Sequence, residues 1–146
     1  MTIKLLTPED VTANMENQMI NLFKQLNPDL QLNPLAKIMA KRDQLSLVYC
    51  LEGSQIIGMA SMVTYSVLSG SKGLVEDVVV DVNARGKGLG RKLMEELLSI
   101  AEQKGLTEVL LFTGNHRQSA IRLYTKLGFV KSESGMYRIK LNQGEM

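Results

Sequence analysis

The hydrophobic positions of this chain form two kinds of pattern. Short apolar or alternating runs are typical of strands, and apolar residues spaced three and four positions apart are typical of amphipathic helices. The strand pattern occurs at residues 3–6, 45–51, 55–65, 74–82 and 109–112, and again at 129–130 and 136–141. The helix pattern occurs at residues 7–26, in a short segment after Asn33-Pro34, at 89–103 and at 117–127.

The order of these elements predicts an α+β fold, in which a mixed sheet carries helices on both faces. Thr7 as an N-cap, with Pro8 at the first helical position, predicts where the first helix begins. Glu52-Gly53-Ser54 predicts a hairpin between the second and third strands, and residues 67–73 predict a Gly/Ser loop. Glu133-Ser134-Gly135 predicts a hairpin that closes the fold.

A glycine-rich turn stands between the strand at 74–82 and the helix at 89–103. It reads Arg85-Gly86-Lys87-Gly88-Leu89-Gly90, with Arg91 next to it. Glycines let backbone amides approach an anion closely, and a helix N-terminus adds free N–H groups and partial positive charge. The turn therefore predicts an anion site suited to a pyrophosphate. It lacks the Gly-Lys-Ser/Thr of a P-loop and the glycine spacing of a dinucleotide fingerprint.

Composition and charge limit the class of protein and the partners that we expect. The 146 residues fit one domain, 1–146, with 45% hydrophobic and 22% charged residues. A net charge of +2 gives no general affinity for nucleic acid or membranes, so we expect neither as a partner. Cys50 is the one cysteine and His116 the one histidine, so an internal disulfide and a multi-histidine metal centre are excluded and no metal is expected. The chain shows no signal-peptide pattern and no transmembrane span, so we expect a cytoplasmic protein.

Two motifs follow one another in the second half of the chain. Arg85, Gly88 and Gly90 stand at a strand-to-helix junction, and the pattern Ala-x-x-x-Tyr-x-x-x-Gly-Phe runs from Ala120 to Phe129. Together they resemble the GNAT family of N-acetyltransferases, whose acetyl-CoA signature, Arg/Gln-x-x-Gly-x-Gly/Ala, is complete here. The resemblance is strongest over residues 74–130, and the order of elements agrees with it along the whole chain. It implies a GNAT-like acyl-CoA N-acyltransferase fold.

The resemblance also implies a cofactor and a reaction. Acetyl-CoA would be the co-substrate, with its pyrophosphate on the amides of the glycine-rich turn and its pantetheine arm along the edge of the preceding strand. An amine of a small molecule or peptide would attack the thioester directly, so no protein nucleophile is needed. The alternative is a non-catalytic acyl-CoA sensor on the same fold. The expected cofactor contacts are Val78, Val79, Val80, Arg85, Gly86, Lys87, Gly88, Leu89, Gly90 and Arg91, together with Asn115 or Arg117.

Glu76 and Asp77 are the candidates for the base that accepts a proton from the amine. Adjacent strand residues face opposite sides, so Asp77 is expected to share a face with Val75 and Val79, and Glu76 to face the other way. A carboxylate in an apolar strand is costly unless solvated, so at least one should face a wet cleft. Similarity to polyamine acetyltransferases of this family assigns the base role to Glu76, with Asp77 as the runner-up. Ordinary polar contacts are the structural alternative.

Tyr124 of the second motif is the candidate acid or hydrogen-bond donor to the leaving thiolate, because a phenol stays protonated at neutral pH. The alternative is a core tyrosine with a satisfied hydroxyl.

Several points remain open at the level of sequence. The family often has Asn three residues before the alanine of the second motif, where this chain has Arg117; Asn115 or Arg117 is left as the contact to coenzyme A. His116 is either an acid–base group or a surface residue. The acceptor pocket is expected between the first two helices, residues 66–73 and the C-terminal hairpin. The acceptor's identity, the length of the acyl group and a homodimer are not decided by the sequence.

Overall fold

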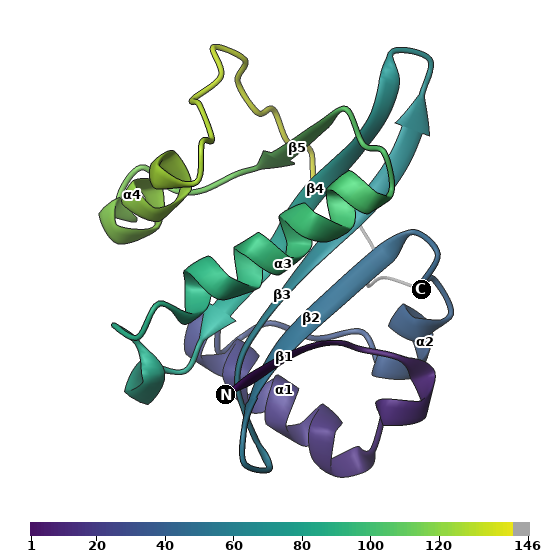
Figure 1. The fold of residues 1–146 in the computed structure, drawn as a ribbon, viewed down its shortest axis with the longest axis vertical. Helices are drawn as coiled ribbons and strands as arrows, with labels where there is room; N and C mark the ends of the chain where they lie inside the picture. The colour runs from purple at the N-terminus through teal and green to yellow at the C-terminus, as the bar shows by residue number, and fades with distance from the viewer. Residues whose placement is uncertain (142–146) are drawn as a thin grey trace.

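Five strands form one mixed sheet in the computed structural model, which describes residues 1–141. Their order across the sheet is that of the chain: the first four strands pair antiparallel, and the last pairs parallel to its neighbour (Figure 1). The strands are β1 (Thr2–Leu5), β2 (Leu45–Glu52), β3 (Gln55–Val67), β4 (Gly70–Val80) and β5 (Glu108–Leu111). The predicted mixed sheet is confirmed.

Helices cover both faces of this sheet, as predicted. They are α1 (Ala13–Leu26) and α2 (Leu35–Met39) on one face, α3 (Leu89–Gln103) on the other, and α4 (Gln118–Lys126) beside the start of α3 (Figure 1). Strand β2 shows why two layers are needed. Val48 and Cys50 pack in the cluster on the α3 face, whereas Leu47 and Tyr49 pack in the cluster on the α1 face. Because successive strand residues point to opposite faces, an apolar strand needs a helix on each side.

The first helix begins later than predicted. Residues Pro8–Asp10 form a separate 3₁₀ turn that is capped by Thr7. Val11 and Thr12 then adopt extended backbone, and the Thr12 hydroxyl accepts a hydrogen bond from the Met15 amide at 3.1 Å. Thr12 is therefore the N-cap of α1. Thr7 and Thr12 both carry N-cap chemistry, and the extended residues Val11 and Thr12 divide the predicted helix in two.

The predicted loop at residues 67–73 is also wrong. Strand β3 continues through Val67 and β4 begins at Gly70, so only two residues turn the chain. The Ser66 and Ser71 hydroxyls lie 2.8 Å apart across this ladder. Ser and Gly are typical of loops, but here cross-strand pairing outweighs their local preference.

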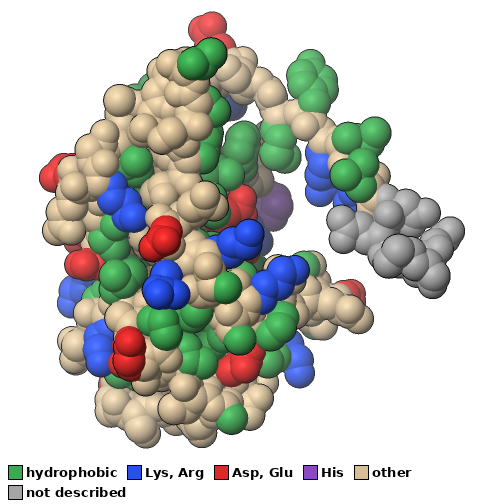
Figure 2. Space-filling view, turned by 90° about the vertical axis from the view of Figure 1, so that its right-hand side faces the viewer, with side chains coloured by type: hydrophobic (Ala, Val, Ile, Leu, Met, Phe, Trp, Pro, Cys, Tyr) green, Lys and Arg blue, Asp and Glu red, His purple; other side chains and the backbone are tan. Residues whose placement is uncertain are grey.

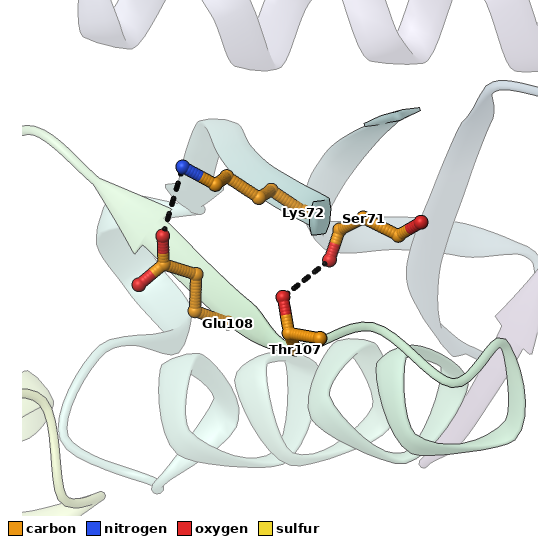
Figure 3. A network of polar contacts seen from close by, with 4 residues as sticks. All are labelled: Ser71, Lys72, Thr107 and Glu108. Atoms are coloured by element: carbon orange, nitrogen blue, oxygen red, sulfur yellow. Dashed lines mark hydrogen bonds and ion pairs between the residues drawn. The ribbon is translucent and has the colours of Figure 1, made fainter. Parts of the chain in front are cut away.

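One end of β5 is fixed firmly to β4. Lys72 Nζ lies 3.1 Å from Glu108 Oε1, and the Thr107 hydroxyl donates to the Ser71 carbonyl at 3.0 Å (Figure 3). The Thr107 amide donates to the same carbonyl at 2.8 Å. These contacts hold the first residues of β5 in register, so that any divergence of the two strands must occur further along.

The predicted C-terminal hairpin is absent from the described residues. Residues 129–141 contain no strand: Phe129 packs beside Tyr124, and the segment after it forms an arch that stands away from the body (Figures 1 and 2). Val130 is 89% exposed and Tyr137 is 98% exposed. The alternation at 136–141 does resemble a strand, but a strand also needs a paired neighbour, and periodicity does not supply one.

Within residues 1–141, no helix is both long and apolar enough to cross a membrane.

The α3 layer generates a prediction about stability. Leu97 is fully buried between α3 and the sheet, so Leu97→Ala should lower the free energy of unfolding by about 2–5 kcal/mol through lost burial and a residual cavity. Chemical denaturation measures this. Glu96→Ala, on the exposed side of the same helix, should change stability by less than about 0.5 kcal/mol. Equal effects of the two substitutions would contradict the assigned packing.

Candidate active site

A β-bulge in β4 separates the two candidate carboxylates. Met59 pairs with Val79 and Ser61 pairs with Glu76, so three steps along β4 match two along β3. Asp77 has φ of +58°, and it is the one non-glycine residue with positive φ among residues 1–141. The extra residue changes which face the following side chains point to.

The predicted facing of this segment is therefore wrong. Val75 packs in the cluster on the α3 face, whereas Val79 packs in the cluster on the α1 face. Asp77 cannot share a face with both. Strict alternation holds only in a regular strand, and the bulge between these residues interrupts it.

Strands β4 and β5 separate directly before this bulge. Their last pair is Val75 with Leu111, and a cavity of about 360 Å³ opens beyond it. Six of the candidate site residues named from the sequence line this cleft: Glu76, Asp77, Val78, His116, Arg117 and Tyr124. Residues from β4, the segment after β5 and α4 thus meet at one place.

The cleft raises the pKa of both carboxyl groups. Glu76 and Asp77 remain accessible to solvent, but the surrounding protein removes part of their hydration, which disfavours the charged forms. Partial burial is the larger cause of the raised pKa of Glu76, and the neighbouring charge of Asp77 adds to it. For Asp77, burial alone raises the pKa. A raised pKa brings a carboxylate closer to the range in which it exchanges protons near neutral pH.

Tyr124 lies half-buried on the opposite wall, on α4. Its ring contacts that of Phe129 edge to face, with centroids 6.0 Å apart. Burial raises the pKa of the Tyr124 phenol, and the nearby charge of Arg117 offsets part of the rise. The phenol therefore stays protonated at neutral pH and can donate a hydrogen bond into the cleft.

The glycine-rich turn has the backbone that an anion site requires. Gly86 and Gly88 have φ of +82° and +76°, and α3 begins directly after them at Leu89. A Cβ on either glycine would meet no protein atom within 4 Å. The positive φ angles, rather than crowding, are thus the reason for glycine. The Arg85, Lys87 and Arg91 side chains are exposed around this turn, and Arg91 Nε lies 3.7 Å from Glu95 Oε2.

The turn and the cleft are joined by a free strand edge. On one side Val79 and Val80 pair with β3, and on the other side β5 no longer pairs with them. Helix α4 packs closely on the first turn of α3: a Cβ added to Gly90 would lie 3.3 Å from the Leu123 side chain. An extended ligand lying on this edge would reach from the turn to the cleft, with its backbone-like groups paired to β4.

The structure treats the three candidates after β5 differently. Arg117 and His116 line the cleft, whereas Asn115 does not, and the Asn115 carbonyl accepts from Gln118 Nε2 at 2.8 Å. Cys50 is fully buried in the core, as predicted. Among residues 1–141, no group of three or more His, Cys, Asp and Glu side chains is arranged to hold a metal ion.

Sequence reasoning missed some of the cavity walls. Phe112, Thr113 and Gly114 line the cleft because they follow the last paired residue of β5. A second cavity of about 260 Å³ lies on the α1 face and also reaches Asp77. Its described lining comes in part from the first two helices, as expected for the acceptor pocket, but includes neither residues 66–73 nor the C-terminal segment.

Comparison with known proteins agrees with this geometry. A sequence model described as "Acetyltransferase (GNAT) family" matches residues 12–129. The chain is 28% identical over 142 residues to glucosamine 6-phosphate N-acetyltransferase of Trypanosoma brucei brucei, covering 93% of each chain.

Solved structures show the same architecture. An acetyltransferase of Trypanosoma brucei superposes with a TM-score of 0.77 at 28% identity, covering 96% of this chain and 100% of that one. Glucosamine-6-phosphate N-acetyltransferase of Arabidopsis thaliana superposes with a TM-score of 0.77 at 22% identity, covering 95% of this chain and 99% of that one, and this likeness supports the fold. The strand-to-helix turn, the diverging strands and the match to the family across residues 12–129 lead to one conclusion: this chain belongs to the GNAT family of acetyltransferases.

Proposed function

We propose that this protein transfers the acetyl group of acetyl-CoA to a primary amine, with Glu76 as base and Tyr124 as hydrogen-bond donor. One observation carries the proposal: Glu76, Asp77 and Tyr124 line a single cleft at the point where β4 and β5 diverge. The free edge of β4 leads from this cleft to the glycine-rich turn.

The residues present fit coenzyme A. The amides of Gly86, Gly88 and the first turn of α3 would hold the pyrophosphate, and the edge at Val78, Val79 and Val80 would pair with the pantetheine arm. When bound, acetyl-CoA supplies the activated acetyl group. Arg117 lines the cleft and Asn115 does not, which favours Arg117 as the additional contact.

Glu76 suits the role of base because its pKa is raised while its side chain stays accessible. A carboxylate with a raised pKa binds a proton more readily than an ordinary glutamate does. The neighbouring Asp77 contributes to that rise and adds negative charge that would attract a protonated amine. Proton transfer from the amine nitrogen to Glu76, directly or through water, leaves the neutral amine that can attack.

Tyr124 suits the role of donor because it is half-buried and lines the other wall of the same cleft. A positioned donor in a partly dry site stabilises developing negative charge more than it would in water. The sulfur that leaves during acyl transfer is where such charge develops.

The acceptor class is supported by relatives. The Trypanosoma and rice relatives are named for glucosamine 6-phosphate, a small amine, although the match to the rice protein spans 70 residues. A small-molecule amine is therefore the leading class, with a peptide amine as the second.

The pyrophosphate site generates one prediction. Gly88→Val should weaken binding of coenzyme A at least about tenfold, because a β-branched residue disfavours φ of +76° and the turn must shift. Arg85→Ala should weaken binding less, since backbone amides supply most donors. Gly105→Val is the matched control: Gly105 has φ of +71° at the other end of α3, so the strain is similar while the turn stays intact. If calorimetry shows that Gly88→Val binds coenzyme A with unchanged affinity, the turn is not the pyrophosphate site.

The base generates a second prediction. The wild type should release free thiol from acetyl-CoA only when an amine is added, and Glu76→Gln should slow this release by about 10²-fold or more. The loss should be greatest below neutral pH, where the amine is most fully protonated. Glu52→Gln, at the exposed end of β2, is the control. Binding of coenzyme A by the wild type without any amine-dependent release of thiol would indicate a sensor. A larger loss of turnover in Asp77→Asn than in Glu76→Gln would assign the base role to Asp77.

The donor generates a third prediction. Tyr124→Phe keeps the ring against Phe129 and removes only the hydroxyl, so the fold should hold while turnover falls about 10²-fold. The dissociation constant of coenzyme A should change little. Tyr65→Phe, at the far end of β3, should behave as wild type. Activity of Tyr124→Phe within about threefold of wild type would leave Tyr124 as a packing residue, since that is less than about 1 kcal/mol of barrier.

A further inference from the structure

The lining of the cavity on the α1 face bears on which amine this protein accepts. Most of its wall is apolar and comes from α1, the segment at residues 30–35, α2 and the central strands. Met19, Phe23, Leu35, Leu47 and Met59 belong to this wall, and each is almost completely buried. At about 260 Å³, the cavity lies just below the size of pockets that hold drug-sized ligands, so it suits a small molecule.

The charges on this wall are all negative. Among the described residues that line the cavity, the ionisable ones are Glu16 and Asp77, and there is no lysine, arginine or histidine. The Glu16 carboxylate accepts a hydrogen bond from the Leu35 amide at 2.7 Å, so it is engaged in holding the start of α2. The Asp77 side chain has no hydrogen-bond partner among residues 1–141. Asp77 is therefore the carboxylate that is available to a ligand.

Asp77 also connects this cavity with the reaction cleft. Asp77 lines both cavities, because it lies at the bulge, where the side chains of β4 change the face of the sheet to which they point. A cation held at Asp77 would lie at the boundary of the cleft that contains Glu76 and Tyr124. The rest of the same molecule would then extend into the apolar cavity.

We propose that the acceptor is a small primary amine with an uncharged, apolar body, held with its ammonium at Asp77 and its body in the cavity on the α1 face. This inference rests on the proposed acetyl transfer and narrows its substrate. The apolar wall gains from covering apolar surface, and the carboxylate compensates the amine's charge. Partial burial raises the pKa of Asp77, and a bound cation would offset that lost hydration.

The same lining disfavours a phosphorylated acceptor. A phosphate in this cavity would face two carboxylates and no basic side chain, and it would lose hydration without a compensating partner. The relatives named for glucosamine 6-phosphate therefore support a small amine as the acceptor class of this chain, but not a phosphorylated one.

The test compares amines of different chemistry. Thiol release from acetyl-CoA is measured with 2-phenylethylamine, spermidine, glucosamine, glucosamine 6-phosphate and a short peptide with a free amino terminus. We expect kcat/KM for 2-phenylethylamine to exceed that for glucosamine 6-phosphate by at least about tenfold. In parallel, calorimetry measures binding of 2-phenylethylamine to the protein saturated with coenzyme A, and Asp77→Asn should weaken this binding about tenfold.

A charge placed in the cavity provides the sharper test. Leu30 lines the cavity and is 47% exposed, so Leu30→Lys should fold normally while adding a cation to the wall. It should lower kcat/KM for 2-phenylethylamine and raise it for glucosamine 6-phosphate. Leu68→Lys adds the same charge at the exposed β3–β4 turn, outside the cavity, and should change neither value.

The outcomes separate this inference from the proposed function. Preferred turnover of glucosamine 6-phosphate, spermidine or only the peptide would overturn the apolar acceptor and leave acetyl transfer standing. An absence of turnover with every amine would overturn acetyl transfer, and the calorimetry would still decide the cavity. Failure of 2-phenylethylamine to bind, or binding that Asp77→Asn does not weaken, would overturn the inference.

Discussion

The point on which this structure depends is the place where β4 stops pairing with β5. Up to Val75 and Leu111 the two strands form a regular parallel ladder, and the contacts of Lys72 and Thr107 hold its first residues together. Beyond this pair the ladder ends and a cleft opens between the strands. A strand edge without a neighbour presents free N–H and C=O groups, which an extended ligand can pair with. The separation of the two strands thus produces both the cleft and the unpaired edge of β4.

The bulge at Asp77 belongs to the same feature. A non-glycine residue with positive φ is uncommon and costs about 1–2 kcal/mol, so the surroundings must hold it in place. Strand β3 does so from the side, and apolar clusters on both faces hold the flanking valines, with Val75 toward α3 and Val79 toward α1. This support holds the backbone of the two residues, and their side chains have different surroundings: Glu76 lines the cleft, whereas Asp77 lines both the cleft and the cavity on the α1 face.

The electrostatics of the cleft follow from its shape. The two carboxylates lose part of their hydration there, and each would be less easily charged than in water. Arg117 is the basic side chain of the cleft lining, whereas Arg85, Lys87 and Arg91 lie together at the far end of the β4 edge, around the glycine-rich turn and the start of α3. An anionic group and a cationic group of the reacting partners would therefore be drawn to opposite ends of one path.

The sequence by itself determined most of the elements and the chemistry available to them. Apolar periodicity located α3 at 89–103, where the structure has it, and located four of the strands to within a few residues. The glycines of the turn and the motif around Tyr124 identified the family. These features are local, because they depend on side-chain spacing and on backbone angles that glycine alone adopts readily.

Only the tertiary structure decided the remainder. The face of Asp77 depends on a bulge that arises from the register between β3 and β4, which no spacing within β4 reveals. The segment at 136–141 alternates like a strand yet forms no strand pair among the described residues, since pairing requires a partner as well as a pattern. The negative charge and apolar wall of the second cavity come from residues as far apart in sequence as Glu16 and Asp77. Such features result from contacts between distant segments, and these contacts form only when the whole chain packs.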